Sequence, residues 1–234
     1  MIPGVVASSF QSAVAAGKVN LIASYSGQTI NLGYTLALDK QYTSGFIVVC
    51  IGTDEGSVSN VRFKQDTSSG LDFDYDTGVN TTGGIGRSSS RIGHLNVANS
   101  PSGTIDDVYF LGTFDGNETA IAVYHVDVAT WVLEDSASWE STNTDQPSID
   151  TAPRTSVHAV AFAAVGSASF FIGDYTQDVN WTTGAVYNPS AGGDQGGLCS
   201  LWDIGAMTSQ NVVHEPTISG STDHAMSILV IDVG

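Results

Sequence analysis

Three aspartates at alternate positions, Asp72, Asp74 and Asp76, are the first candidates for metal binding. They stand in LDFDYDTG, and carboxylate oxygens are the ligands that Ca²⁺ prefers. The spacing differs from that of an EF-hand loop, because Gly78 comes one place late and no bidentate acid follows. Alternate residues of a strand share one face, so the sequence predicts a strand with three outward carboxylates. We expect no cofactor, and a surface Ca²⁺ site at these residues is the alternative.

Residues that could catalyse a reaction do not stand at motif spacing. The five histidines are scattered and form neither an HxH nor an HExxH pair of zinc ligands. The stretches GGIG and GGDQGG are not followed by helix patterns, so neither is a phosphate loop, and a serine-nucleophile elbow is absent. We therefore expect a protein that is not an enzyme. A glycan-cleaving enzyme stays an alternative, because its two acids need only lie close in space.

Aromatic residues stand among Asn, Asp and turn-forming residues in the segment 175–197, YTQDVNWTTGAVYNPSAGGDQGG. Trp and Tyr rings at loop tips can stack on the uncharged faces of sugars. Tyr175, Trp181 and Tyr187 are therefore the candidate glycan contacts. The alternative is that these rings belong to the core.

Composition limits the partners of such sites. The 234 residues include 7 Lys and Arg against 24 Asp and Glu, a net charge of -17, and 41% are hydrophobic. A chain this apolar can form a core, while its negative charge repels phosphate backbones and anionic membrane surfaces. No stretch approaches the roughly 20 apolar residues of a membrane helix. We expect neither nucleic-acid binding nor membrane insertion.

The elements that position these residues read as strands. Period-2 alternation recurs in segments such as TAIAVYHVDV and AMSILVIDV, with turn formers such as SPSG and DGNE between them. Roughly ten to twelve strands at this spacing predict an all-β fold, an antiparallel β-sandwich of jelly-roll type. Cys50 and Cys199 lie in apolar runs, which favours buried free thiols, and a disulfide between them is the alternative.

The chain divides into a short amino-terminal arm, residues 1–18, and one sandwich domain, residues 19–234. The opening lacks the basic residues of a signal peptide, and residues 8–17 form either a short helix or an extended arm. The polar segment 135–156 is predicted as a long crossover within the sandwich, with Trp139 as a packing anchor. The arm is too short to form a core of its own, so we expect it to dock on neighbouring subunits. The arm contacts are Met1, Ile2, Pro3, Val5, Val6 and Phe10.

Two stretches resemble a β-sandwich module of tailed-bacteriophage proteins, GFIVVCIGTDEGSVSNVRF and HLNVANSPSGTIDDVYFLGTFDGNETAIAVYHVDV. The opening MIPGVVASSF is similar to the MIPGIVAS opening of many phage structural proteins. The resemblance follows strands and turns over residues 36–233 and departs at VRFKQDTSSG, where the module usually has a glycine pair. It carries no catalytic residues and implies a virion component.

The Pro-x-Gly-Thr turn of this resemblance also makes sense by its residues alone. Pro101 presets φ for a turn position, and Gly103 can take a positive φ. Asp106 and Asp107 follow the turn, where we predict that they protect a sheet edge.

The expected function is that of a non-enzymatic structural protein on the surface of a tailed-phage virion. Its place would be a tail fibre or tail tip, or a decoration of the capsid. The expected partners are other virion proteins and copies of itself, with a host-surface glycan as a further candidate. The alternative function is a carbohydrate-binding adhesion module.

Overall fold

The computed structural model describes residues 18–28, 34–54, 62–65, 73–80, 88–111, 118–144, 148–168, 180–187, 196–217 and 222–234. Their regular structure is almost entirely strand, with one short 3-10 turn, η2 (Val97–Asn99). The strands are β1 (Val19–Gln28), β2 (Tyr34–Tyr42), β3 (Phe46–Asp54), β4 (Arg62–Gln65), β5 (Asp74–Asn80), β6 (Ser88–Asn96), β7 (Ile105–Leu111), β8 (Glu118–Val126), β9 (Val132–Thr144), β10 (Ile149–Asp150), β11 (Arg154–Ala168), β12 (Thr182–Tyr187), β13 (Gly196–Gln210), β14 (Val213–His214) and β15 (Thr222–Asp232). The all-β prediction is confirmed. The described part of the chain contains no helix of the length and hydrophobicity that a membrane span requires.

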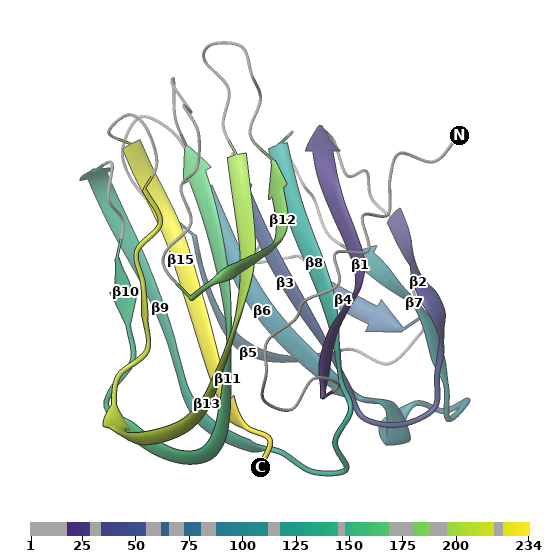
Figure 1. Cartoon of the computed structure of the whole chain (residues 1–234). Coiled ribbons are helices and arrows are strands. Elements are labelled where there is room, and N and C mark those ends of the chain that lie inside the picture. The colour runs from purple at the N-terminus through teal and green to yellow at the C-terminus, as the bar shows by residue number, and fades with distance from the viewer. Residues whose placement is uncertain are drawn as a thin grey trace.

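Two five-stranded antiparallel sheets face each other (Figure 1). The inner sheet has the order β1-β8-β3-β6-β5, and the outer sheet has the order β12-β13-β11-β15-β9. The small sheet, β2-β7-β4, packs on the other face of the inner sheet, and β10 pairs with β14 beside the outer sheet. This arrangement confirms the predicted antiparallel sandwich. The jelly-roll connectivity and the division into arm and domain stay predictions.

The strand β3 shows why the inner sheet is apolar on both faces. Ile47, Val49 and Ile51 belong to the cluster shared with the small sheet, while Val48 and Cys50 belong to the cluster shared with the outer sheet. All five are completely buried. A strand covered on both faces reads as a continuous apolar run, and FIVVCI is such a run.

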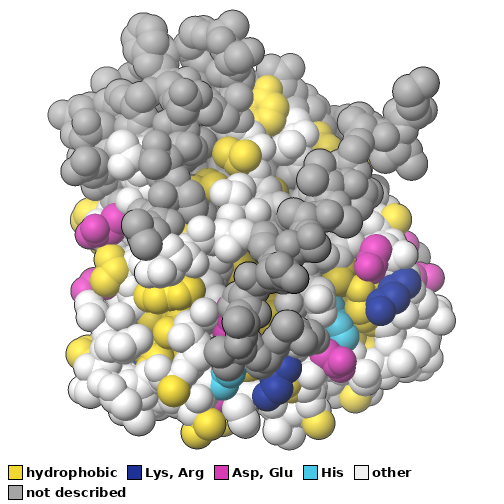
Figure 2. All heavy atoms as spheres, viewed as in Figure 1, with side chains coloured by type: hydrophobic (Ala, Val, Ile, Leu, Met, Phe, Trp, Pro, Cys, Tyr) yellow, Lys and Arg dark blue, Asp and Glu magenta, His cyan; other side chains and the backbone are white. Residues whose placement is uncertain are grey.

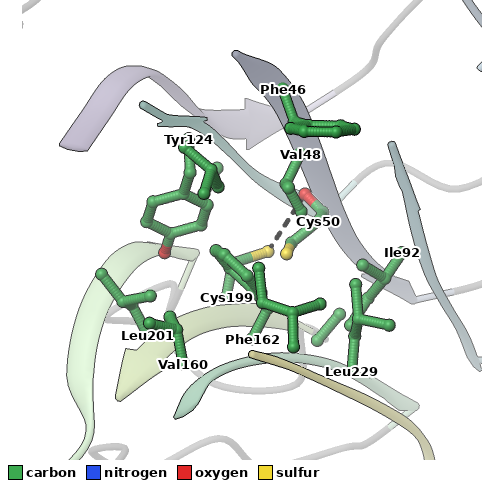
Figure 3. Packing of buried hydrophobic residues seen from close by; sticks show 14 of the residues in the cluster. Phe46, Val48, Cys50, Ile92, Tyr124, Val160, Phe162, Cys199, Leu201 and Leu229 are labelled. Atoms are coloured by element: carbon green, nitrogen blue, oxygen red, sulfur yellow. Dashed lines mark hydrogen bonds between the residues drawn. The ribbon is translucent and has the colours of Figure 1, made fainter. Parts of the chain in front are cut away.

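The two cysteines lie in the core between the inner and outer sheets (Figure 3). Both are free and buried, which confirms the prediction. The thiol of Cys199 donates to the carbonyl oxygens of Cys50 at 3.3 Å and Ala120 at 3.4 Å. Burial raises the pKa of the Cys199 thiol to about 12, so the reactive thiolate is scarce at neutral pH.

Thiol labelling should follow this burial. We expect an aromatic disulfide reagent to react with neither cysteine of the native protein over minutes, because both thiols are buried. In denaturant both should react. Labelling of the native protein as fast as that of the unfolded chain would contradict the structure.

The two sheets touch backbone to backbone at one end of the sandwich. A Cβ added at Gly166 would collide with the carbonyl oxygens of Thr53 and Ser89 across the interface. Similarly, a Cβ at Gly52 would collide with the Val165 carbonyl, and one at Gly197 with the Gly52 carbonyl. Only glycine allows so close an approach of two main chains.

The turn before β7 forms as predicted. Gly103 has φ +69°, and the strand begins two residues later. The strand β7 lies between β2 and β4 in the small sheet. The described ladder of β7 with β4 begins at Val108, so Asp106 and Asp107 precede it, and their predicted place at a sheet edge stays a prediction.

The predicted crossover over residues 135–156 is wrong. Its first ten residues belong to β9, and β10 and the start of β11 lie in its later part. The side chains of β9 from Val132 to Glu140 are half-buried or exposed, which explains why the stretch DSASWE is polar. The candidate helix at residues 8–17 lies outside the described residues.

Candidate assembly interface

The strand β9 forms an edge of the outer sheet. It pairs with β15 on one side, and no described strand pairs with its other side. A 13-residue edge presents a row of main-chain N–H and C=O groups that another strand can bind.

Exposed apolar side chains concentrate on this strand. Val132 is 60% exposed, Leu133 51% and Trp139 49%. Only two other large apolar side chains of the described residues are exposed, Val157 on β11 and Val186 on β12. On the face seen in Figure 2, apolar side chains lie among uncharged polar atoms, with acidic side chains at several places. Val132 and Leu133 lie at the start of β9 and Trp139 lies seven residues further along, so exposed apolar side chains occur at two places on this edge strand.

The register of β9 with β15 places Trp139 on the outer face of the sheet. Trp139 pairs with Met226, and Ala137 pairs with Ile228. Met226 and Ile228 belong to the apolar cluster of that face, and directly paired residues of two strands share a face. Trp139 therefore continues this cluster to the open edge.

Three acids make β9 selective about what it can bind. Asp135 accepts a hydrogen bond from the Ala152 N–H at 3.0 Å and pairs with Arg154 at 3.1 Å. The ladder to β15 shifts register beside Asp135, so Glu134 has no directly paired residue there. Glu140 lies further along the strand. Charges and irregularities of this kind reduce nonspecific edge pairing.

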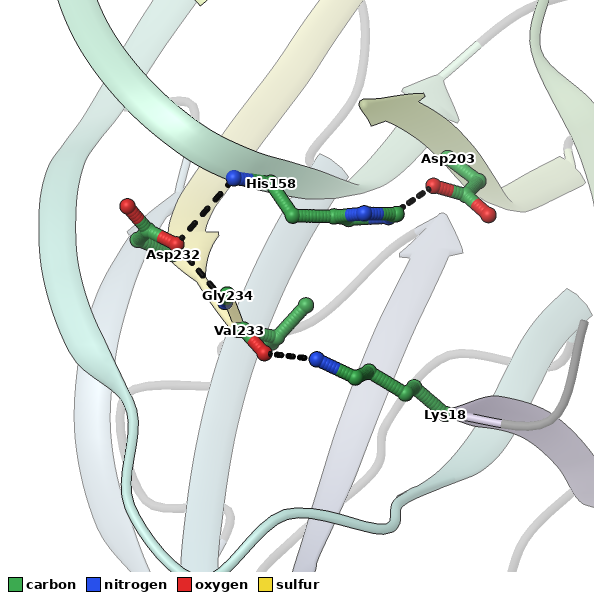
Figure 4. Close-up of polar contacts among 6 residues, drawn as sticks. All are labelled: Lys18, His158, Asp203, Asp232, Val233 and Gly234. Atoms are coloured by element: carbon green, nitrogen blue, oxygen red, sulfur yellow. Dashed lines mark hydrogen bonds and ion pairs between the residues drawn. The ribbon is translucent and has the colours of Figure 1, made fainter. Parts of the chain in front are cut away.

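The predicted arm joins the sandwich at a fixed point. The Lys18 ammonium donates a hydrogen bond to the Val233 carbonyl near the end of the chain (Figure 4). The Lys18 carbonyl accepts from the Asp127 N–H at 2.6 Å. Residue 18 is thus held on the sandwich, and any arm must leave from this corner. The predicted arm contacts are outside the described residues: Met1, Ile2, Pro3, Val5, Val6 and Phe10.

Polar side chains beside this corner bind main chain and one another. Burial alone would raise the pKa of the Asp232 carboxyl, but N–H groups of Gly234, Val157 and His158 hydrogen-bond to it and lower that pKa. The Nε2 atom of His158 lies 2.7 Å from an Asp203 oxygen (Figure 4). This pair links β11 to β13 where their ladder is irregular.

The predicted cation site falls partly outside the described residues, because Asp72 is not among them. Asp74 and Asp76 belong to β5, but the ladder to β6 shifts register between Tyr75 and Thr77. The regular alternation that the prediction assumed is interrupted at Asp76. Within the described ranges, no three His, Cys, Asp or Glu side chains are grouped to hold a metal ion.

The structure corrects one of the three candidate glycan contacts. Trp181 is buried, its indole N–H donates to the Val213 carbonyl at 2.9 Å, and its ring lies edge-on to His214 at 4.4 Å. It is a core residue and cannot stack on a sugar. Tyr187 is half-buried on β12, and Tyr175 lies outside the described residues.

The sequence alone does not predict the exposed residues of the β9 edge. The sequence predicts that Trp139 anchors a crossover, and no pattern in the sequence marks Val132 or Leu133. Alternation in SASWEST was the available signal, but Ser and Thr on both faces conceal it. No protein-family model, curated protein or solved structure matches this chain.

Proposed function

We propose that this protein is a non-enzymatic structural subunit on the surface of a tailed-phage virion, as a tail fibre, tail-tip or capsid-decoration component. It joins its neighbours through the open edge of β9. The observation that carries this proposal is that three of the exposed large apolar side chains, Val132, Leu133 and Trp139, lie on this one edge strand. The sequence resemblance to phage modules supports the location.

The role of β9 follows from the hydration of its exposed edge. An isolated subunit leaves three large apolar side chains and a row of main-chain groups hydrated. A neighbouring chain that covers them gains the hydrophobic free energy, about 25 cal/mol per Å² of apolar surface. Surface acids oppose unspecific contacts, since the chain carries a net charge of -17. The edge therefore favours assembly with a matching partner.

The competing function as a glycan-binding module loses support at its central residue. Trp181, the largest of the candidate rings, belongs to the core, which leaves Tyr187 and Tyr175 for such a surface. An adhesive role would need other exposed rings, and Trp139 on the β9 edge is already assigned to assembly.

Incorporation into particles tests the proposal. Virions from cells that produce tagged full-length protein should carry it through a density gradient, and antibody should label intact particles. Trp139→Lys should lower incorporation by about tenfold or more, because a charged ammonium replaces an apolar contact at an interface centre.

The matched control is Val157→Lys, which changes an even more exposed apolar residue, 76%, on β11, a strand that does not pair with β9. It should incorporate like wild type. Wild-type protein absent from purified particles would refute the virion location, while equal loss in both variants would refute the role of β9.

A further inference from the structure

We infer that the edge of β9 binds residues 1–17 of a second copy of this chain, as an added strand. This rests on the proposed function and names the partner of the same surface. Three observations carry it: the charges on β9, the composition of residues 1–17, and the exposure of β9 in the single chain.

Charge argues against the pairing of two β9 strands with each other. Each copy would bring Glu134, Asp135 and Glu140 to one shared ladder. Like charges across a ladder destabilise it, and each chain adds a net charge of -17. The partner that avoids this cost is a segment without acids.

Residues 1–17 are such a segment. They contain no Asp, Glu, Lys, Arg or His, and the stretch from Val5 to Ala16 contains neither Gly nor Pro. As a strand its 12 residues span about 40 Å, close to the length of the 13-residue β9. Val6, Phe10 and Val14 fall on one face of that strand, where an aromatic ring can meet Trp139.

The donor of this strand is a neighbour. In the single chain Val132, Leu133 and Trp139 are about half exposed or more, and no described strand pairs with the open side of β9. In addition, β1 follows the arm and is one edge of the inner sheet, whereas β9 packs near β5, the opposite edge. Donor and acceptor therefore lie on opposite sides of the sandwich.

Each subunit offers its arm on one side and accepts an arm at the other. Two copies can therefore exchange arms about a twofold axis, or the pairing can repeat from copy to copy. Closure of the repeat gives a ring, and an open repeat gives a filament. The assembly is not limited to a twofold dimer.

Disulfide trapping between full-length chains tests the pairing. One copy carries Ser8→Cys, Ser9→Cys or Ser12→Cys, the other carries Ser138→Cys on β9, and the mixture is oxidised and run without reductant. Because the native cysteines are buried, we expect few cross-links through them. We expect interchain cross-links from at least one arm position, about tenfold above a mixture with Ser102→Cys, an exposed turn residue. Adding Trp139→Lys to the β9 copy should abolish them, and adding Val157→Lys should not.

The other outcomes overturn the inference. Cross-links of Ser138→Cys with itself would mean that β9 pairs with β9. A chain that carries both an arm cysteine and Ser138→Cys tests the remaining case. Cross-links that form only within this chain would mean that each arm covers its own edge. No cross-link above the Ser102→Cys background would remove the arm as partner. In that last case, particles that still require Trp139 would leave the proposed function standing.

Discussion

Replacing Gly166 by alanine should lower the free energy of unfolding by about 3 kcal/mol or more, because overpacking that cannot relax forces main chains apart. The added methyl group would meet the carbonyl oxygens of Thr53 and Ser89, which belong to strands of the opposite sheet. Main-chain atoms held in two ladders cannot turn aside as a side chain could. For a domain of this size the loss corresponds to a melting temperature lower by about 6 to 12 °C, measured by calorimetry.

The control is Gly103→Ala in the turn before β7. An added Cβ there has no neighbour within 4 Å, but φ is +69°. A left-handed conformation costs an alanine about 1 to 2 kcal/mol, so the loss should be clearly smaller. Equal losses at both positions would show that the sheets do not approach as closely as the structure indicates.

Acid should destabilise the protein through His214. This side chain is completely buried against Trp181, and neither ring nitrogen has a hydrogen-bond partner among the described residues. Burial lowers its pKa from 6.5 to about 3. The folded protein therefore holds a neutral ring, while the unfolded chain binds a proton below pH 6.5. Stability is fully present above that pH and falls toward pH 3, by about 1.4 kcal/mol per pH unit at most.

Denaturant titrations between pH 7 and 4.5 measure this effect. We expect this histidine alone to lower the free energy of unfolding by about 2 to 3 kcal/mol over that range. The Asp232 carboxyl acts in a separate pH range. Its pKa is lowered in the folded protein, so its contribution to stability is lost only below the ordinary value of 3.8. His214→Phe keeps an aromatic ring without a titrating group and should flatten the slope. His214→Leu serves if phenylalanine does not pack, and an unchanged slope in both variants would contradict the assignment.

Hydrogen exchange shows where the acid acts first. His214 pairs with Ile149 in a ladder of only two residues on each strand, β10 with β14. So short a ladder can open without unfolding the sandwich. Amides of residues 148–151 and 211–215 should therefore lose protection at a higher pH than those of β3.

Sequence reasoning succeeded where burial imposes a pattern. The apolar runs around Cys50 and Cys199 predicted strands with buried thiols, and both cysteines lie in the core. Apolar side chains are needed on both faces of such strands, so the sequence must show them. Pro101 and Gly103 predicted their turn for a similarly local reason, the φ angles that these residues allow.

It failed where the answer depended on which strands become neighbours. The edge position of β9 is a property of the assembled sheet, and no local pattern around Trp139 encodes it. Trp181 looked like an exposed ring because Asn, Thr and Gly surround it. Its burial depends on contacts with Val213 and His214, more than thirty residues away.

The order of strands in the inner sheet has a consequence for how the chain folds. Its central ladder joins β3 to β8, pairing Phe46 with Val126, and its edge joins β1 to β8, pairing Val19 with Val126. The paired residues of both ladders are far apart in the sequence. The chain between them must close into a loop before the pairs gain any free energy, which makes folding slow. Meanwhile the apolar strands are open to aggregation, and the repulsion between strongly acidic chains lowers the rate at which two half-folded copies meet.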